Sequence, residues 1–341
     1  MLSFKQIGVS FLATLKDIAE KCGTSTATVS YVLSGRGEEK RISAEMQQLI
    51  AKTAEDLEYT RKSRSGSPLS KRVIVYFPLL YLNMLLSTFL DGMTTAVNLE
   101  SSNIDVVLRP YEQNKLHLQH ELWTPAKNCA ALVVSPGGAD LANLTETPTA
   151  IPVILLNRTL PGYSSVCIDQ LEAGQLAAKL AIKKGGDDIL LVTTSSLFGV
   201  SWRTNAFVDF CSKNGISLAK STYYADTSLR SGYELGKKLV KDKLLKKVIF
   251  CVYDMTALGL STALTDSGVK VGRDVLILTT NSSNAELFEF ASPPVTVIDM
   301  RFKDVCQMAM RLALDIAAGR ASYPQDVSIH PVAVYRQSCP F

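Results

Sequence analysis

The stretch TLKDIAEKCGTSTATVSYVLSG, residues 14–35, decides how the rest of the sequence is interpreted. Thr14 predicts the start of a helix, because its hydroxyl group can cap the first turn. Gly23 predicts the end of that helix, since glycine readily adopts the left-handed backbone conformation found there. Ser25 can cap a second helix. Between the caps, apolar residues recur at helical spacing: Ile18, Ala19 and Cys22 on the first helix, and Val29, Val32 and Leu33 on the second. Two helices joined by a tight glycine turn form a helix-turn-helix motif.

The outer face of the second helix carries side chains that are short and mostly hydroxylic: Thr26, Ala27, Thr28, Ser30 and Tyr31. A helix with such a face can enter the major groove of DNA, where its N-terminal residues reach the base edges. Ser25, Thr28 and the helix N-terminus at Thr14 are suited to contacts with phosphates. A third helix, capped by Ser43, is predicted to complete the bundle with an inner face of Met46, Leu49, Ile50, Ala54 and Leu57. An all-helical dimerisation module remains the alternative.

Downstream of a basic, Gly/Pro/Ser-containing segment at 61–72, short β-branched apolar runs alternate with amphipathic stretches. Such runs are typical of parallel strands that are covered on both faces. They lie at 72–78, 104–110, 130–136, 151–157, 188–194, 247–253 and 274–280. Helices are predicted at 171–184, 202–214, 231–241 and 256–266. The pattern predicts a three-helix domain followed by a doubly wound α/β core of two similar subdomains. Ligands bind at the carboxyl ends of such strands, which predicts a cleft between the subdomains.

Composition narrows the possible functions. The 36 basic and 32 acidic residues nearly cancel, so any nucleic-acid signal must come from local clusters. The seven cysteines include no C-x-x-C pair, which argues against a disulfide framework or a structural zinc site and favours a reducing cytoplasm. We find no catalytic motif, and we expect no enzyme activity, no cofactor and no metal. His117 and His120 form H-x-x-H but are expected to be surface residues.

The segment 14–35 closely resembles the DNA-binding domain of the LacI family, the lactose-repressor-like bacterial transcription regulators. It carries Thr14, Asp17, Ala19, Gly23, Ser25, Thr28, Val29, Ser30 and Gly35 at the family's spacing. The likeness continues through PVILLNR (152–158), FCVYDMTALGLSTAL (250–264) and PPVTVIDM (293–300), and so covers about 14–341. The resemblance implies a core like a periplasmic sugar-binding protein and a homodimer on a palindromic operator.

The resemblance also divides the chain. It implies a helix-turn-helix domain at 14–60, a basic hinge at 61–71 and an effector-binding and dimerisation core at 72–341, while residues 1–13, which precede the likeness, are expected to form a disordered extension. Within the core we expect one subdomain at about 72–160 and 293–322, and the other at about 161–292 and 323–341. In the family the hinge folds into a helix that wedges a leucine into the minor groove. Here Gly66 and Pro68 oppose a helix, so three interpretations stay open: a wedge at Leu69, an extended segment in which Arg61, Lys62 and Arg64 contact DNA, or a solvated linker.

Two further departures concern recognition. The family commonly has arginine at the position of Tyr31, so the preferred operator should differ. In the effector cleft the resemblance points to Arg203, Trp202, Tyr253, Asp254 and Asn281, of which Tyr253 and Asn281 replace the family's Asn and Asp. Asp254 can equally cap a helix, and Trp202 can equally serve packing. A sugar, a sugar phosphate, a nucleoside, a less polar ligand or no ligand all remain open.

The sequence therefore predicts a sequence-specific DNA-binding transcription regulator. It is expected to be a cytoplasmic, ligand-responsive repressor of a carbohydrate or other catabolic operon, acting as a homodimer on double-stranded DNA. The alternative is a solute-binding protein of a transport system, which would share the core fold but would have no use for residues 14–60.

Overall fold

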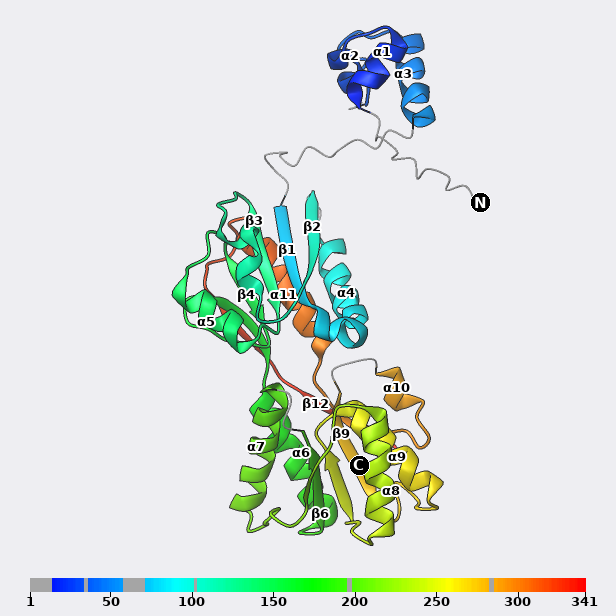
Figure 1. Cartoon of the computed structure of the whole chain (residues 1–341), viewed down its shortest axis with the longest axis vertical. Helices are drawn as coiled ribbons and strands as arrows, with labels where there is room; N and C mark the ends of the chain where they lie inside the picture. Colours follow the sequence, from blue (N-terminus) through cyan, green and yellow to red (C-terminus); the bar gives the residue numbers. More distant parts are fainter. Residues whose placement is uncertain (1–13, 34–35, 58–70, 101–102, 195–197, 282–284) are drawn as a thin grey trace, which may run out of the picture. The chain divides into compact units, whose positions relative to one another are not determined.

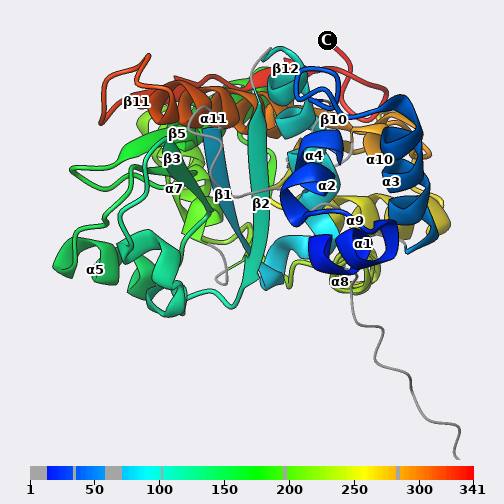
Figure 2. The ribbon, with the colours of Figure 1, turned by 90° about the horizontal axis from the view of Figure 1, so that it is seen from above.

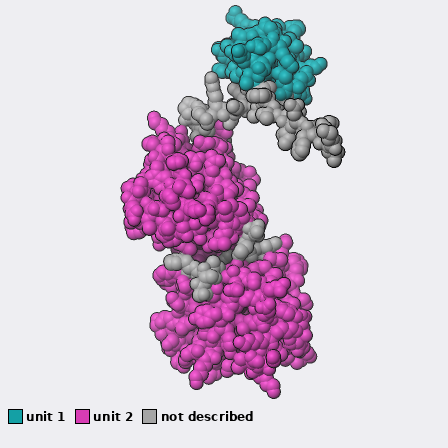
Figure 3. Space-filling model, viewed as in Figure 1, with its two compact units in different colours: residues 1–67 teal, residues 68–341 magenta. Residues whose placement is uncertain are grey.

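The structure, a computed structural model, describes residues 14–33, 36–57, 71–100, 103–194, 198–281 and 285–341. The chain divides into two compact units, Met1–Ser67 and Pro68–Phe341 (Figure 3). We call the first the helical unit and the second the core. The predicted extension at 1–13 and most of the predicted hinge, 61–70, lie outside the described residues. The last predicted hinge residue, Lys71, is instead the first residue of a strand of the core.

The helical unit is a bundle of α1 (Leu15–Cys22), α2 (Thr26–Leu33) and α3 (Ala44–Asp56). Its small core is made of the apolar residues that the helical spacing predicts to face inward: Ile18, Ala19, Cys22, Val29, Ile50 and Ala54. Met46 and Leu57 pack against this cluster. Leu49 does not, since 47% of its surface is exposed, so its predicted place on the inner face is wrong. The inward stripe of α3 passes through residues 46, 50, 54 and 57, and Leu49 lies beside it.

Local capping explains the boundaries of α1. Thr14 and Asp17 form a capping box, in which the Thr14 hydroxyl accepts from the Asp17 backbone N–H at 3.3 Å. The Asp17 carboxylate accepts in turn from the Thr14 N–H at 2.7 Å. Both bonds satisfy N–H groups that a helix start would otherwise leave unpaired. At the other end, Gly23 has a φ of 60° and a ψ of 35°, the left-handed conformation that its sequence position predicts.

The core contains two six-stranded sheets, which form two lobes (Figure 1). In the first lobe the strand order is β11-β5-β4-β3-β1-β2, and every pairing is parallel. The strands are β1 (Lys71–Pro78), β2 (Ile104–Tyr111), β3 (Cys129–Val134), β4 (Val153–Leu156), β5 (Ser164–Ile168) and β11 (Asp326–Ile329). In the view of Figure 2, β1 and β2 run side by side, and α11 crosses behind them.

In the second lobe the order is β12-β10-β9-β8-β6-β7. Only the edge strand β12 runs antiparallel, paired with β10. The strands are β6 (Ile189–Thr193), β7 (Thr222–Tyr224), β8 (Val248–Cys251), β9 (Leu276–Asn281), β10 (Thr296–Asp299) and β12 (Val332–Val334). Their central members are wholly buried, as expected for apolar runs covered on both faces.

Helices cover the sheets in layers. One face of the first sheet packs against α4 (Leu82–Asn98) and α11 (Phe302–Ala317), while its other face carries α5 (Gly138–Glu146) and the short helices η2 (Leu116–Leu118) and η3 (His120–Trp123). The second sheet lies between the pair α6 (Gln170–Gly185) and α7 (Phe198–Lys213) and the pair α8 (Leu229–Lys241) and α9 (Asp254–Asp266). The short α10 (Glu286–Glu289) follows β9. Within the described residues, no helix has the length and apolarity needed to cross a bilayer.

Three crossover segments connect the lobes: Asp169 between β5 and α6, residues 300–301 between β10 and α11, and residues 330–331 between β11 and β12. The predicted subdomain boundaries differ from these points. The prediction assigned β5 and β11 to the second subdomain and β10 to the first, whereas each pairs in the opposite sheet. Short strands show no apolar run that reveals their partner, because strand pairing is set by tertiary packing.

Candidate nucleic-acid interface and effector cleft

The outer face of α2 is the candidate DNA-reading surface. Thr26 and Ala27 are exposed, and Thr28, Ser30 and Tyr31 are half-buried. At the start of the helix the Ser25 hydroxyl accepts from the Thr28 backbone N–H at 3.0 Å and lies 2.9 Å from the Thr28 hydroxyl. The residues expected to read bases therefore lie on the surface of the helical unit, next to a capped helix N-terminus, which is the end of a helix that attracts phosphates.

Tyr31 is held by cations from the segment that follows α2. The guanidinium carbon of Arg36 lies 5.3 Å from the centre of the Tyr31 ring, and the Lys40 ammonium lies 5.6 Å from it. Cations within about 6 Å of a ring centre are attracted to its π face. The geometry thus groups two positive charges around the side chain that replaces the family's arginine.

The four hinge residues predicted to contact DNA, Arg61, Lys62, Arg64 and Leu69, lie outside the described residues. Their roles remain predictions.

Arg203 is the central cation of the candidate effector cleft. It comes from α7, and only 7% of its surface is exposed. Its Nη1 donates to Gln170 Oε1 at 2.9 Å, while its Nε is buried without a hydrogen-bond partner. Burial lowers the pKa of the guanidinium to about 10, and the charge of Asp254 opposes that shift. A buried and incompletely satisfied charge of this kind is typical of a ligand site.

Two further predicted residues lie beside Arg203. Tyr253 is 9% exposed and directly follows β8, and burial is the largest cause that raises its pKa. Asp254 is 6% exposed and begins α9, where its Oδ1 accepts from the Met255 N–H at 2.8 Å. Both influence the charge on Arg203, so the structure brings these three together. Trp202, in contrast, is 47% exposed on the surface of α7.

The first lobe contributes two residues that the sequence reasoning did not single out, Arg158 and Tyr81. Arg158 follows the carboxyl end of β4, and burial lowers its pKa while the neighbouring Tyr81, Cys167 and Tyr111 oppose that shift. Tyr81 ends the short helix η1 (Leu79–Tyr81), and it also acts on the pKa of Tyr253 in the second lobe. The signal for Arg158 was available, since a charged residue directly after a parallel strand is a candidate ligand contact.

Asn281 lies on β9, which pairs with β8, the strand that Tyr253 follows. It ends β9, is 2% exposed and lines a cavity of about 560 Å³. The wall from the first lobe is α4, with Ser87, Thr88 and Asp91. Lys303 of α11 lies beside α4 and pairs with Asp91 at 2.7 Å, and Asp299 and Arg301 line the cavity from the end of β10 and the crossover that follows it. We call this the inter-lobe cavity. Its size suits a small molecule, and its lining is rich in charged groups of both signs.

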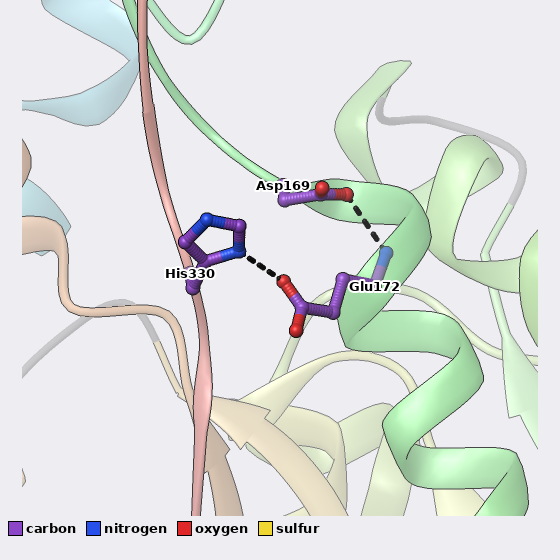
Figure 4. Close-up of side chains that lie close together, drawn as sticks. All are labelled: Asp169, Glu172 and His330. Carbon is purple, nitrogen blue, oxygen red and sulfur yellow. Dashed lines mark hydrogen bonds and ion pairs between the residues drawn. The ribbon is translucent and has the colours of Figure 1, made fainter.

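Among the described residues, one cluster offers three side chains that metals prefer, Asp169, Glu172 and His330 (Figure 4). Their ligand atoms lie within 4.8 Å of one another. All three are engaged within the cluster, since Asp169 Oδ1 accepts from the Glu172 N–H at 2.8 Å and the Glu172 carboxylate pairs with the His330 ring. The hydrogen bond and charge of Glu172 raise the pKa of His330, and the positive charge of Arg301 opposes that shift. The cluster joins two of the three crossover segments.

Comparisons with known proteins bear on both units. Residues 14–62 match the model described as "Bacterial regulatory proteins, lacI family", and residues 180–339 match "Periplasmic binding protein-like domain". The chain is 22% identical to the HTH-type transcriptional regulator GalS of Salmonella typhimurium over 96% of both chains.

Solved structures agree with these matches. A LacI family transcription regulator from Clostridium acetobutylicum is 26% identical, with a TM-score of 0.72 over 78% of this chain and 99% of that one. The lac repressor dimer bound to operator and an anti-inducer is 18% identical, with a TM-score of 0.74 over 97% of this chain and 100% of that one. The second likeness concerns the fold alone.

Proposed function

This chain belongs to the LacI family of bacterial regulatory proteins, and from that premise we propose that it is a sequence-specific DNA-binding repressor whose affinity for its operator is set by a small molecule. The proposal joins two parts of the chain, the outer face of α2 and the cleft around Arg203. The relatives that the chain resembles are transcriptional regulators rather than enzymes.

The observation that carries DNA binding is the exposed face of α2. Its first outward residues, Thr26 and Ala27, are small and exposed, and they directly follow the turn at Gly23. Small side chains let a helix approach the floor of the major groove, where hydrogen bonds and methyl contacts distinguish base pairs. Arg36 and Lys40 lie beside the same helix and are suited to phosphates.

The test uses purified full-length protein and duplexes selected from a random pool. Ala27→Glu places a negative charge on the α2 face, and Ala51→Glu makes the same change at an exposed position of α3. We expect Ala27→Glu to weaken binding of the selected duplex at least 100-fold, because the carboxylate faces the acceptors and phosphates of the groove. Ala51→Glu should change affinity by less than about fivefold.

The results of this binding test either support or refute the proposed function. Selective binding with a steep loss of affinity as salt rises is expected for a protein that neutralises several phosphates. If the two variants lose affinity equally, α2 is not the reading helix. If the wild-type protein binds no duplex in preference to random DNA, the proposed function is wrong.

We propose that the effector binds between the lobes and contacts Arg203, Tyr253, Asp254 and Asn281, with Trp202 at its edge. The support comes from the burial of the first four residues and, for Tyr253, Asp254 and Asn281, from their position at the carboxyl end of a strand or the start of a helix. An effector that favours one arrangement of the lobes changes operator affinity by its differential binding, with a typical coupling of about 1–3 kcal/mol, or roughly 5–150-fold.

The proposal also includes the homodimer, the DNA contacts of the hinge and of the helix N-termini, and the location of the protein in the cell. The protein acts as a homodimer, because a two-fold operator needs two reading helices about one turn of DNA apart. The hinge residues Arg61, Lys62 and Arg64 contact phosphates or the minor groove, and Leu69 contacts DNA as a wedge in the minor groove. Thr14 and Ser25 contact phosphates through helix N-termini. The protein is cytoplasmic, where its DNA is, and it controls a carbohydrate or other catabolic operon.

The alternative, a solute-binding protein of a transport system, makes a different prediction. Deleting residues 1–60 would leave its solute binding unchanged and would affect no other activity. For a repressor the same deletion abolishes duplex binding while the core still binds the effector. One truncated protein, assayed for both activities, separates the two functions.

A further inference from the structure

Arg203 carries a buried charge that the protein itself does not neutralise at close range. The guanidinium is 7% exposed, and its one protein hydrogen bond is to the neutral amide oxygen of Gln170 at 2.9 Å. In the described part of the chain, no carboxylate lies within 4.0 Å of its nitrogens, and Nε has no hydrogen-bond partner. Burying an ionised group is costly unless it is paired and hydrogen-bonded, so the site is incomplete as it stands.

A second guanidinium lies in the opposite lobe. Arg158 is half-buried at the carboxyl end of β4, and its Nη1 donates to the backbone oxygen of Asn157. Tyr81 interacts with both Arg158 and Tyr253, and Tyr253 interacts with Arg203. Tyr81 of the first lobe is therefore close enough to act electrostatically on Arg158 and on Tyr253, and Tyr253 of the second lobe is close enough to act on Arg203.

Asp254 is the carboxylate whose charge acts on Arg203. Asp254 lies in the same environment as Arg203 but uses Oδ1 to accept from the Met255 N–H at the start of α9. A helix N-terminus itself carries positive partial charge, which competes for that carboxylate. The buried Arg203, the half-buried Arg158 and a helix N-terminus all bring positive charge to this part of the core.

We propose that the effector is a small organic anion whose carboxylate or phosphate group binds Arg203 through the unsatisfied Nε and closes onto Arg158. This inference rests on the proposed function and specifies the ligand of its effector site. Charge-assisted hydrogen bonds to arginine are roughly twice as strong as neutral ones. A carboxylate or phosphate can also accept two parallel hydrogen bonds from the planar guanidinium group, a geometry that a single neutral hydroxyl group does not match. The rings of Tyr81 and Tyr253 provide a face and hydroxyl groups for the body of the ligand.

The experiment compares neutral and anionic members of matched pairs with the full-length protein. Glucose is paired with glucose 6-phosphate, galactose with galacturonate, and adenosine with adenosine monophosphate. Inorganic phosphate is titrated against chloride at equal ionic strength. Thermal denaturation reports ligand binding, and fluorescence anisotropy of a selected duplex reports its release or retention. We expect at least one anionic member to protect the protein at a concentration at least tenfold lower than its neutral partner.

Variants test the arginine itself. Arg203→Lys keeps the charge but loses the fork and Nε, and should weaken the anion at least tenfold. Arg230→Lys makes the same change at an exposed position of α8 and should leave ligand binding unchanged. Circular dichroism verifies that both variants fold. The comparison of neutral and anionic ligands uses the wild-type protein alone. It therefore tests the inference even when Arg203→Lys does not fold.

The outcomes are distinct from those of the proposed function. Equal protection by neutral and anionic partners, protection by no anion including phosphate, or an anion affinity that is unchanged in Arg203→Lys would each overturn the inference. Selective duplex binding would survive all of these results. A failure of selective duplex binding would instead overturn the regulator assignment, whatever the ligand experiments show.

Discussion

His330 and Glu172, 158 residues apart in the sequence, connect two crossover segments of the core through a hydrogen bond of 2.5 Å between the imidazole Nδ1 and the carboxylate. Glu172 lies in the first turn of α6, just after the crossover at Asp169, and His330 lies on the crossover between β11 and β12. Figure 4 shows the imidazole directed toward the carboxylate. The pair therefore lies where the two lobes are joined, and it forms an ion pair only when the imidazole is protonated.

The first prediction concerns pH. The hydrogen bond and charge of Glu172 raise the pKa of His330 above 6.5, with Asp169 acting in the same direction and Arg301 against it. A raised folded-state pKa stabilises the fold below the unfolded-state value, and that contribution is lost as the pH rises through the folded value. We expect His330→Asn to lower the melting temperature at pH 6 by on the order of 1 °C, because exposed ion pairs contribute little, and to leave it unchanged at pH 8.5.

The controls for this prediction are Glu172→Gln and His120→Asn. Glu172→Gln removes the partner of His330 and should reproduce the pH dependence of His330→Asn. His120→Asn alters an exposed histidine on η3 and leaves the His330–Glu172 pair intact. A difference between wild type and His330→Asn that grows with rising pH has the wrong sign for this pair and would refute the assignment.

The second prediction concerns the contact of α8 with α9. A methyl group on Gly259 would lie 1.9 Å from the Leu229 carbonyl oxygen, and one on Gly232 would lie 2.0 Å from the Thr256 carbonyl oxygen. Backbone atoms cannot rotate away as side chains do, so the helices would have to separate. We expect Gly259→Ala to lower the free energy of unfolding of the core by about 1–3 kcal/mol, measured by urea denaturation.

Gly138→Ala is the matched control for that substitution. A methyl group at Gly138, the first residue of α5, would meet no atom within 4 Å. Because alanine restricts the unfolded chain more than glycine does, this variant should be neutral or more stable by about 0.4–1 kcal/mol. Equal losses in the two variants would show that the close packing at Gly259 does not determine the effect, since helix propensity favours alanine over glycine.

The third prediction tests the cap that begins α1. Thr14→Ala removes the hydroxyl that accepts from the Asp17 N–H, and should destabilise the helical unit by about 0.5–2 kcal/mol. Thr14→Ser retains the hydroxyl and should retain most of the stability. Hydrogen exchange of α1 amides in the full-length protein measures the effect without interference from the core. Similar protection in the alanine and serine variants would mean that the capping box contributes nothing.

Local signals in the sequence predicted the helical unit well. The cap at Thr14, the left-handed Gly23 and the inward stripe of Ile18, Val29 and Ile50 all depend on residues close in sequence, and each is confirmed. The apolar runs likewise predicted the central strands of both sheets, since full burial on two faces requires an unbroken apolar run. Leu49 was assigned wrongly because spacing alone does not locate the edge of an inward stripe.

Lobe membership could not be predicted in the same way. β5, β10 and β11 have four or five residues each, and nothing in them specifies which sheet they join. The cleft was predicted only in part. Arg203 was identified through the family resemblance, whereas Tyr81, which acts on the pKa of both Arg158 and Tyr253, comes near Tyr253 only when the lobes fold together.

The last prediction concerns base recognition by Tyr31. Tyr31→Phe keeps the ring, and with it the attraction to Arg36 and Lys40, but removes the single hydroxyl that can bond to a base. We expect discrimination at one base pair of each half-site to fall by about 1–3 kcal/mol, while affinity for random DNA stays within about twofold, because phosphate contacts persist. Tyr31→Ala should also weaken binding to all sequences, since it releases both cations. Selection from a random pool, repeated with each variant, measures both effects. If Tyr31→Phe reduced affinity equally for every sequence, the tyrosine would support the fold of the helical unit rather than read the operator.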